Sequence, residues 1–144
     1  MRRALALLAV LLPSAALAGH ELDNRDLGNG RVLYKEHCAS CHGAELEGQP
    51  DWRKIGKEGL LPAPPHDRTG HTWHHDNRLL FDYTKLGGKA LMEARGVGGF
   101  KSGMEGFADV LSDDEIWDIL AYIRSTWPER IKRIQASRNP PHDG

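Results

Sequence analysis

The sequence predicts an all-α domain with three to five helices and little or no β-sheet. Apolar residues recur at helical spacing through residues 112–127. Two further segments begin at side chains that can cap a helix, one near residue 26 and one at residue 76. Stretches rich in proline and glycine separate the three segments, as expected of loops between helices.

Residues 1–18 have the three parts of a secretory signal peptide. Two arginines precede an apolar run, and small residues at Ala16 and Ala18 flank Leu17. We expect cleavage after Ala18 and export to the periplasm, with an uncleaved anchor as the alternative. The apolar run is too short to span a bilayer comfortably, and no later segment approaches the roughly 20 apolar residues of a membrane helix.

Composition narrows the class of partner. The chain has 19 basic residues (lysine and arginine) and 20 acidic ones, and Arg2 and Arg3 leave with the signal peptide. Nucleic acid is therefore not expected as a partner, because phosphate binding calls for a basic excess. Residues 19–138 fit one domain with one core. The polar, proline-bearing end at residues 139–144 is expected to be disordered.

The first helix is expected to begin near Asp26 or Asn29, either of which is a suitable N-cap, and to run to the first cysteine. Gly30 and Tyr34 fall on nearly the same face of this helix. Glycine lowers helix stability, so its presence indicates that something packs closely against it. We expect this packing partner at the other end of the chain.

The two cysteines of the chain, Cys38 and Cys41, are followed directly by His42. Cys-x-x-Cys-His is the signature of covalent haem attachment, in which each thiol bonds to one vinyl group and the histidine becomes an axial ligand of the iron. Residues three and four apart on a helix project from one face, so the two thiols can hold one edge of the macrocycle. We therefore expect one haem c, attached through Cys38 and Cys41.

A disulfide, a redox pair or a zinc site would fit the two cysteines less well. Two cysteines in an exported protein ordinarily indicate a disulfide, but this one would close a very small loop and stabilise little. A thioredoxin-like redox pair would need strands and helices alternating around it, a pattern not found here. A structural zinc site would need four ligands, and the chain has one cysteine pair.

The middle of the chain is expected to hold a loop and then a helix. The prolines that favour an extended loop are Pro62, Pro64 and Pro65. Asp76 can cap the helix, and Gly87 and Gly88 can end it. Further on, Met92 is interpreted as a helical residue that fills space in the core.

This loop also holds a cluster of four histidines, His66, His71, His74 and His75. One hypothesis is a solvated loop with no chemical role. A second is a site for copper or zinc, since imidazole suits both metals. A third is that one of these histidines supplies the second axial ligand of the iron, which would lower the reduction potential relative to a methionine.

The last helix is the most clearly marked. Ser112 can cap it, Glu115 completes a capping box, and the acidic pair Asp113 and Asp114 complements the positive end of the helix dipole. Its apolar stripe consists of Ile116, Ile119, Leu120, Ile123 and Trp127. Pro128 then ends the helix and opens a further short segment.

With these features the chain resembles the class I c-type cytochromes, the small mono-haem type of the bacterial periplasm. The resemblance covers roughly residues 27–127 and is most specific at "CASCH", at "GMEGF" and in the last helix. It implies that the N- and C-terminal helices cross at a small residue, with one aromatic side chain from each helix at the contact. The matching positions are Gly30, Tyr34 and Tyr122.

The resemblance also implies a methionine as the second axial ligand. Met104, in a glycine-rich loop before the last helix, fits this role better than Met92 does. The family usually has a proline after this methionine, whereas this chain has Glu105.

Two further contacts of the haem are implied by the resemblance. In the family a proline carbonyl accepts the second N–H of the axial histidine and fixes its tautomer and plane, and Pro64 is the matching candidate. Trp73 resembles a family tryptophan whose indole N–H meets a haem propionate. A plain core tryptophan is the alternative.

Two axial ligands would leave no open position on the iron, which favours one-electron transfer between redox proteins. We therefore expect an electron shuttle, or a small electron-delivering subunit of a periplasmic oxidoreductase, rather than an enzyme. A haem peroxidase or a reductase of nitrogen or sulfur oxides is a second hypothesis, but the chain has one haem motif and no obvious catalytic acid and base. A third is a haem-bearing copper carrier or redox sensor that uses the histidine loop.

Overall fold

The computed structural model describes residues 21–56 and 58–140. The expected signal peptide, residues 1–18, and the end of the expected tail, residues 141–144, lie outside the described residues. Among the residues that the structure describes, no helix has the length and apolarity needed to cross a membrane.

All regular secondary structure in the described residues is helical. In chain order the elements are α1 (Leu27–His37), α2 (Ala39–His42), the 3₁₀ helix η1 (Thr72–His74), α3 (Asn77–Leu86), α4 (Gly88–Ala94), α5 (Asp113–Ser125) and α6 (Glu129–Ala136). The described part of the chain has no strand, which confirms the all-α prediction. Its six α-helices exceed the expected three to five. One reason is that the backbone leaves ideal helix geometry at Cys38, with φ −118°, so that α2 forms a separate turn. The other is that the segment after Pro128 forms a helix of its own.

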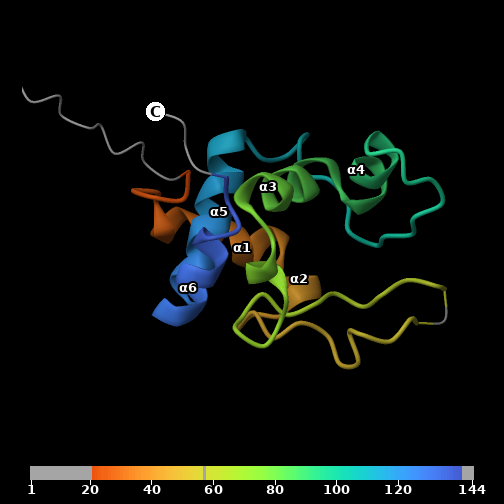
Figure 1. Cartoon of the computed structure of the whole chain (residues 1–144), viewed down its shortest axis with the longest axis horizontal. Coiled ribbons are helices and arrows are strands. Elements are labelled where there is room, and N and C mark those ends of the chain that lie inside the picture. The colour runs from red at the N-terminus through yellow and green to blue at the C-terminus, as the bar shows by residue number, and fades with distance from the viewer. Residues whose placement is uncertain (1–20, 57, 141–144) are drawn as a thin grey trace, which may run out of the picture.

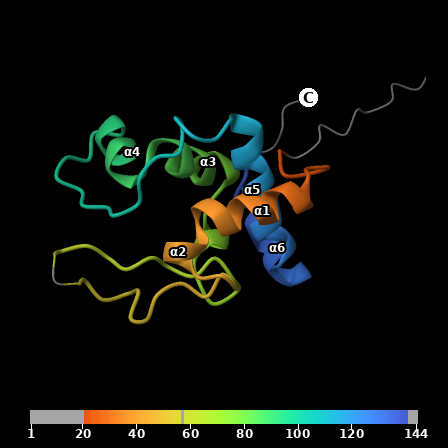
Figure 2. The same cartoon turned by 180° about the vertical axis from the view of Figure 1, so that it is seen from behind.

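α1 and α5 cross at the centre of the molecule (Figure 1 and Figure 2). Gly30 lies at the crossing, where a Cβ atom would overlap the carbonyl of Asp118 and touch Tyr122. About one turn later the rings of Tyr34 and Tyr122 lie 5.7 Å apart between centroids. Glycine is required here because any side chain would push the two backbones apart. The expected crossing at Gly30, Tyr34 and Tyr122 is therefore present.

Local sequence sets where the helices begin and end. The side chains of Asp26 and Asp76 each accept the backbone N–H three residues later, at 2.9 and 2.7 Å, and cap α1 and α3. α5 has the complete capping box between Ser112 and Glu115. α3 ends at Gly87, whose φ of 81° is readily adopted only by glycine.

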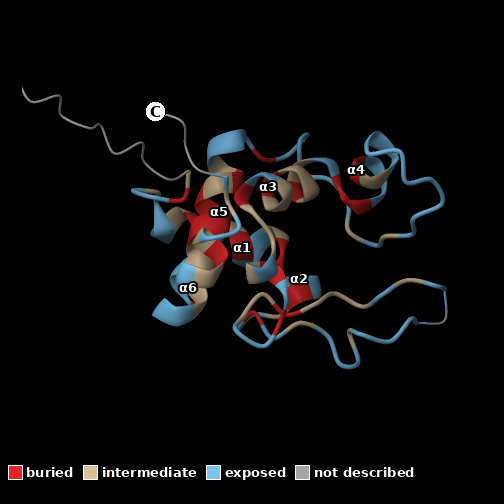
Figure 3. Ribbon diagram, in the orientation of Figure 1, coloured by how far each residue is buried: buried red, intermediate tan, exposed pale blue. Residues whose placement is uncertain are grey.

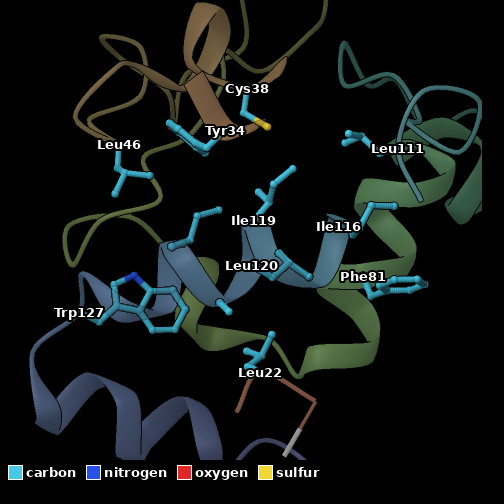
Figure 4. Packing of buried hydrophobic residues seen from close by; sticks show 12 residues of the cluster. Leu22, Tyr34, Cys38, Leu46, Phe81, Leu111, Ile116, Ile119, Leu120 and Trp127 are labelled. Carbon is cyan, nitrogen blue, oxygen red and sulfur yellow. The ribbon is translucent and has the colours of Figure 1, made fainter. Parts of the chain in front are cut away.

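The core forms around α5. The predicted stripe from Ile116 to Trp127 is buried, with no member more than 6% exposed. Tyr34 from α1, Phe81 from α3 and Leu46 from the loop after α2 join it. Figure 4 shows these side chains gathered along α5, and Figure 3 shows buried residues concentrated in α1, α5 and α3. Each fully buried apolar side chain of this size contributes roughly 1.5–3 kcal/mol.

α6 packs against η1 and the start of α3. Gln135 is fully buried, and its Nε2 donates to Asn77 Oδ1 at 2.7 Å and to the His75 carbonyl at 3.3 Å. Asn139, which was expected to belong to a disordered tail, accepts a hydrogen bond from the backbone N–H of Asn77 at 2.8 Å. This bond pairs an N–H of the first turn of α3, a position that has no partner within the helix.

Two long loops leave this helical frame on the same side (Figure 1 and Figure 2). Residues 43–71 join α2 to η1, and residues 95–112 join α4 to α5. Both loops are largely exposed (Figure 3). Their tips approach each other through two pairs of residues, Lys101 with Gly59 and Leu60 with Gly103.

Candidate functional site

The cysteine pair lies at the junction of α1 and α2. The backbone N–H of His42 bonds to the Cys38 carbonyl at 2.9 Å, so Cys38, Cys41 and His42 lie on one helical turn. Cys38 is buried, Cys41 is exposed, and both sulfurs are free. Burial raises the pKa of the Cys38 thiol to about 12, and Cys41 adds to this effect. A raised pKa is the opposite of what a thioredoxin-like nucleophile needs.

His42 is held with one ring nitrogen paired. Its side chain is buried, and Nδ1 lies 2.8 Å from the carbonyl oxygen of Pro64. A carbonyl only accepts, so Nδ1 carries the proton and donates, while Nε2 keeps its lone pair. Burial lowers the pKa of His42, whereas the bond to Pro64 raises it. The outcome is a neutral imidazole in the tautomer that a metal ligand needs.

The segment that carries Pro64 is tied to the residues just after the motif. The backbone N–H of Gln49 donates to the Ala63 carbonyl at 2.8 Å, and Gln49 Oε1 accepts the Ala63 N–H at 3.1 Å. Gly48 has φ +68° and lies directly on the backbone of Pro64, where a Cβ atom would not fit. These contacts fix the Pro64 carbonyl relative to His42.

His66 lies against His42 in a contact that was not expected from the sequence. The two ring centroids are 4.0 Å apart and the ring planes differ by 26°. One hypothesis made His66 a replacement for Met104 as an axial ligand. The structure does not support this role, because the two axial ligands of a haem lie on opposite faces of the macrocycle and cannot stack on each other. The available sequence signal was only that His66 follows Pro64 by two residues.

The other three histidines of the loop pack against aromatic rings, and two of them contact each other. His71 stacks on Trp52 with centroids 5.3 Å apart, His74 lies 3.7 Å from Trp73, and His75 meets the edge of the His71 ring at 5.3 Å. Within the described part of the chain, no group of three or more histidine, cysteine, aspartate or glutamate side chains could hold a metal ion. The copper or zinc site considered for the four histidines is therefore not supported, because only His71 and His75 contact each other, while His66 packs on His42 and His74 on Trp73.

Trp73 has an unpaired polar atom. It lies in η1 and packs against the core, with its indole Nε1 buried and without a hydrogen-bond partner in the described part of the chain. Buried donors are nearly always paired, and an unpaired one costs about 1–3 kcal/mol. A haem propionate is an acceptor that would remove this cost.

Met104 lies in the loop between α4 and α5 and is half-buried. Its carbonyl accepts the N–H of Gly88 at 3.2 Å, and its own N–H donates to Ser102 Oγ at 3.1 Å. The loop can lie on the junction of α3 and α4 because Gly106 has no side chain. A Cβ atom at this position would be too close to the backbone of Leu86. The backbone at Met104 is thus anchored on the helical frame.

Met92 lies on α4, as its interpretation as a helical residue requires. It is half-buried and does not belong to the core, which corrects the expectation that it fills core space. The buried position of this helix is taken by its neighbour Leu91.

Taken together, the side chains fit a covalently attached haem. Cys38 and Cys41 offer two free thiols on one turn. His42 offers a neutral imidazole whose Nε2 keeps its lone pair. Trp73 offers a buried N–H that lacks an acceptor among the described residues.

Comparisons with known proteins agree with this fit. The family model for cytochrome c matches residues 27–127. Cytochrome c-555 of Prosthecochloris aestuarii is 26% identical over 114 residues, which cover 75% of this chain and 95% of that protein. No solved structure matches the chain.

Proposed function

The chain belongs to the cytochrome c family and carries covalently attached haem c, and from this premise we propose that it shuttles single electrons between redox proteins in the periplasm. Cys38 and Cys41 fit the attachment motif of the family. In this proposal His42 and Met104 are the axial ligands.

The observation that carries the proposal is the 2.8 Å contact between His42 Nδ1 and the Pro64 carbonyl. With Nδ1 paired, the ring has only Nε2 left to bind a metal, and its plane is fixed. Bound haem iron would supply the one-electron chemistry. The chain contributes His42 as a strong axial ligand, and the bond to Pro64 keeps its ring in place when the charge of the iron changes.

Met104 is proposed as the second ligand because a thioether on an anchored loop suits a low-spin electron carrier. The backbone bonds at Gly88 and Ser102 support this role, since they limit the positions that the side chain can reach. Glu105 replaces the usual proline, so a carboxylate beside the ligand is expected to influence the choice of redox partner.

Two side-chain ligands leave no position for a substrate, so an electron carrier fits better than an enzyme. The partners are then proteins that donate and accept electrons. The periplasmic location rests on the arginines, apolar run and small residues of positions 1–18.

Spectra of the oxidised and reduced protein test the proposal. Sulfur ligation predicts a weak sulfur-to-iron absorption in the far red, which Met104→Ala should remove and the matched control Met92→Ala should keep. The reduced parent should resist carbon monoxide, whereas reduced Met104→Ala should bind it and should have a lower reduction potential.

Two outcomes would contradict the proposal. A parent that binds carbon monoxide readily has an open iron and favours an enzyme or a gas sensor. A Met104→Ala variant with the spectrum and potential of the parent would point instead to a histidine ligand, and substitution of His71, His74 or His75 would then identify it.

A further inference from the structure

His66 is the neighbour that packs on the face of the His42 ring. The ring centroids lie 4.0 Å apart with an interplanar angle of 26°, so the two imidazoles overlap face to face. Pro64, two residues earlier, contacts the same ring at its edge through the 2.8 Å bond to Nδ1. The short segment that carries Pro64 and His66 therefore contacts the His42 ring both at its edge and on its face.

His66 is itself anchored on three sides. Its backbone N–H donates to the Leu46 carbonyl at 2.8 Å, and its carbonyl accepts the indole N–H of Trp127 at 2.7 Å. Its ring Nδ1 lies 2.7 Å from the hydroxyl oxygen of Thr72. These partners come from the loop after α2, the segment between α5 and α6, and η1, so the ring cannot swing away without disturbing three parts of the fold.

The stack also continues into the helix crossing. The ring of Tyr34, fully buried between α1 and α5, meets the edge of His66 with centroids 6.3 Å apart. The hydroxyl of Tyr34 donates to the Gly43 carbonyl, directly after His42, at 2.8 Å. His66 is thus enclosed between a rigid part of the core and the ring of His42.

One hydrogen bond at the edge of an imidazole leaves the ring free to tilt about that bond. A flat ring on its face removes this freedom. We propose that His66 is a positioning residue that fixes the plane of His42 by stacking on it, while the Pro64 carbonyl fixes its edge. The inference rests on His42 being an axial ligand, as in the proposed function, but not on the identity of the second ligand.

The test compares haem-loaded variants by electron paramagnetic resonance of the ferric state and by reduction potential. The g-values of low-spin ferric haem depend on the orientation of the axial imidazole plane, which a purely structural residue would not change. His66→Ala should shift the g-values and lower the reduction potential, because water gains access to the face of His42. His66→Phe keeps a flat ring and should stay close to the parent.

Two further variants complete the set. Thr72→Val removes the hydroxyl that holds the His66 ring while keeping the side-chain volume, and should shift the g-values in the same direction as His66→Ala but less. His71→Ala removes an exposed histidine of the same loop that stacks on Trp52, and should leave the g-values unchanged.

The inference is overturned if haem-loaded His66→Ala has the g-values and potential of the parent, or if His66→Phe shifts them as far as His66→Ala does. If His66→Ala fails to take up haem, His66→Leu replaces it, since leucine fills the space without a flat face. Unchanged g-values in His66→Leu would again overturn the inference. A parent without the far-red absorption would contradict ligation by Met104 and leave this comparison intact, because the two experiments report on opposite ligands.

Discussion

At the scale of single residues, the site is defined by which buried polar atoms already have partners. His42 Nδ1 has the Pro64 carbonyl and the Tyr34 hydroxyl has the Gly43 carbonyl. The indole Nε1 of Trp73 has no partner among the described residues. In the proposed site, the paired atoms position the proposed axial ligand His42, and the unpaired indole N–H is the proposed donor to a haem propionate.

The substitution Trp73→Phe tests that donor. If the indole binds a propionate, the haem-loaded variant should lose about 1.5–3 kcal/mol of unfolding free energy, the usual contribution of a hydrogen bond to a charged group. Its reduction potential should fall, because the propionate charge is no longer partly neutralised. Denaturant unfolding and redox titration measure the two quantities.

Trp117→Phe is the matched control, since Trp117 stacks on Phe81 with centroids 4.4 Å apart and the change removes a similar volume. The control should keep the reduction potential of the parent. If Trp73→Phe also keeps it and is no less stable than the control, Trp73 is a plain core tryptophan.

At the scale of helices, the crossing of α1 and α5 could be predicted because its information is local. Capping side chains and apolar spacing mark both helices, and Gly30 in the middle of α1 indicates a close contact. The family resemblance then indicated that the two helices cross. Pro64 was predicted in the same way, from its place in a recognisable loop.

The contacts that escaped prediction connect loops to distant parts of the chain. The stack of His66 on His42 depends on the path of residues 43–71, which has no periodic pattern to read. The bond between Gln135 and Asn77 joins α6 to α3 through two amides whose meeting no local signal indicates. A shared metal was one of three hypotheses for the histidines of this loop, but the rings do not converge: His66 packs on His42 and His74 on Trp73, and only His71 and His75 contact each other.

Gly30→Ala tests the crossing. Alanine is favoured over glycine in a helix by about 1 kcal/mol, yet a Cβ atom here would overlap the backbone carbonyl of Asp118. Overpacking of this kind costs roughly 1–3 kcal/mol, so we expect a net loss in unfolding free energy. Denaturant unfolding of the haem-loaded variant measures it.

Gly28→Ala is the control on the same helix, because a Cβ atom there meets only the Asp26 side chain, at 3.3 Å. It should be neutral or stabilising. Equal stability changes in the two variants would show that close packing does not explain the glycine at the crossing.

At the scale of the whole molecule, the fold divides into a helical frame and two long loops. The frame of α1, α3 and α5 holds most of the apolar core (Figure 3). The loops instead carry large apolar side chains that are exposed, with Ile55 at 73% and Leu61 at 56% in the first loop and Val97 at 47% in the second. Loops of this length keep one conformation only when something packs against them, because ordering each residue costs conformational entropy.

Covalently attached haem is a large apolar body that can supply this packing, so its removal should affect the loops first. The variant Cys38→Ser/Cys41→Ser has no thiol for attachment and should lose haem on extraction with acid and acetone, whereas either single variant can keep one thioether. Without haem the protein should lose its cooperative thermal transition, because a major part of its core is missing. Hydrogen exchange should be fast throughout residues 43–71 and 95–112, while amides at the α1–α5 crossing keep some protection. A haem-free protein that melts cooperatively at a temperature close to that of the haem-loaded protein would show that the polypeptide alone fixes both loops.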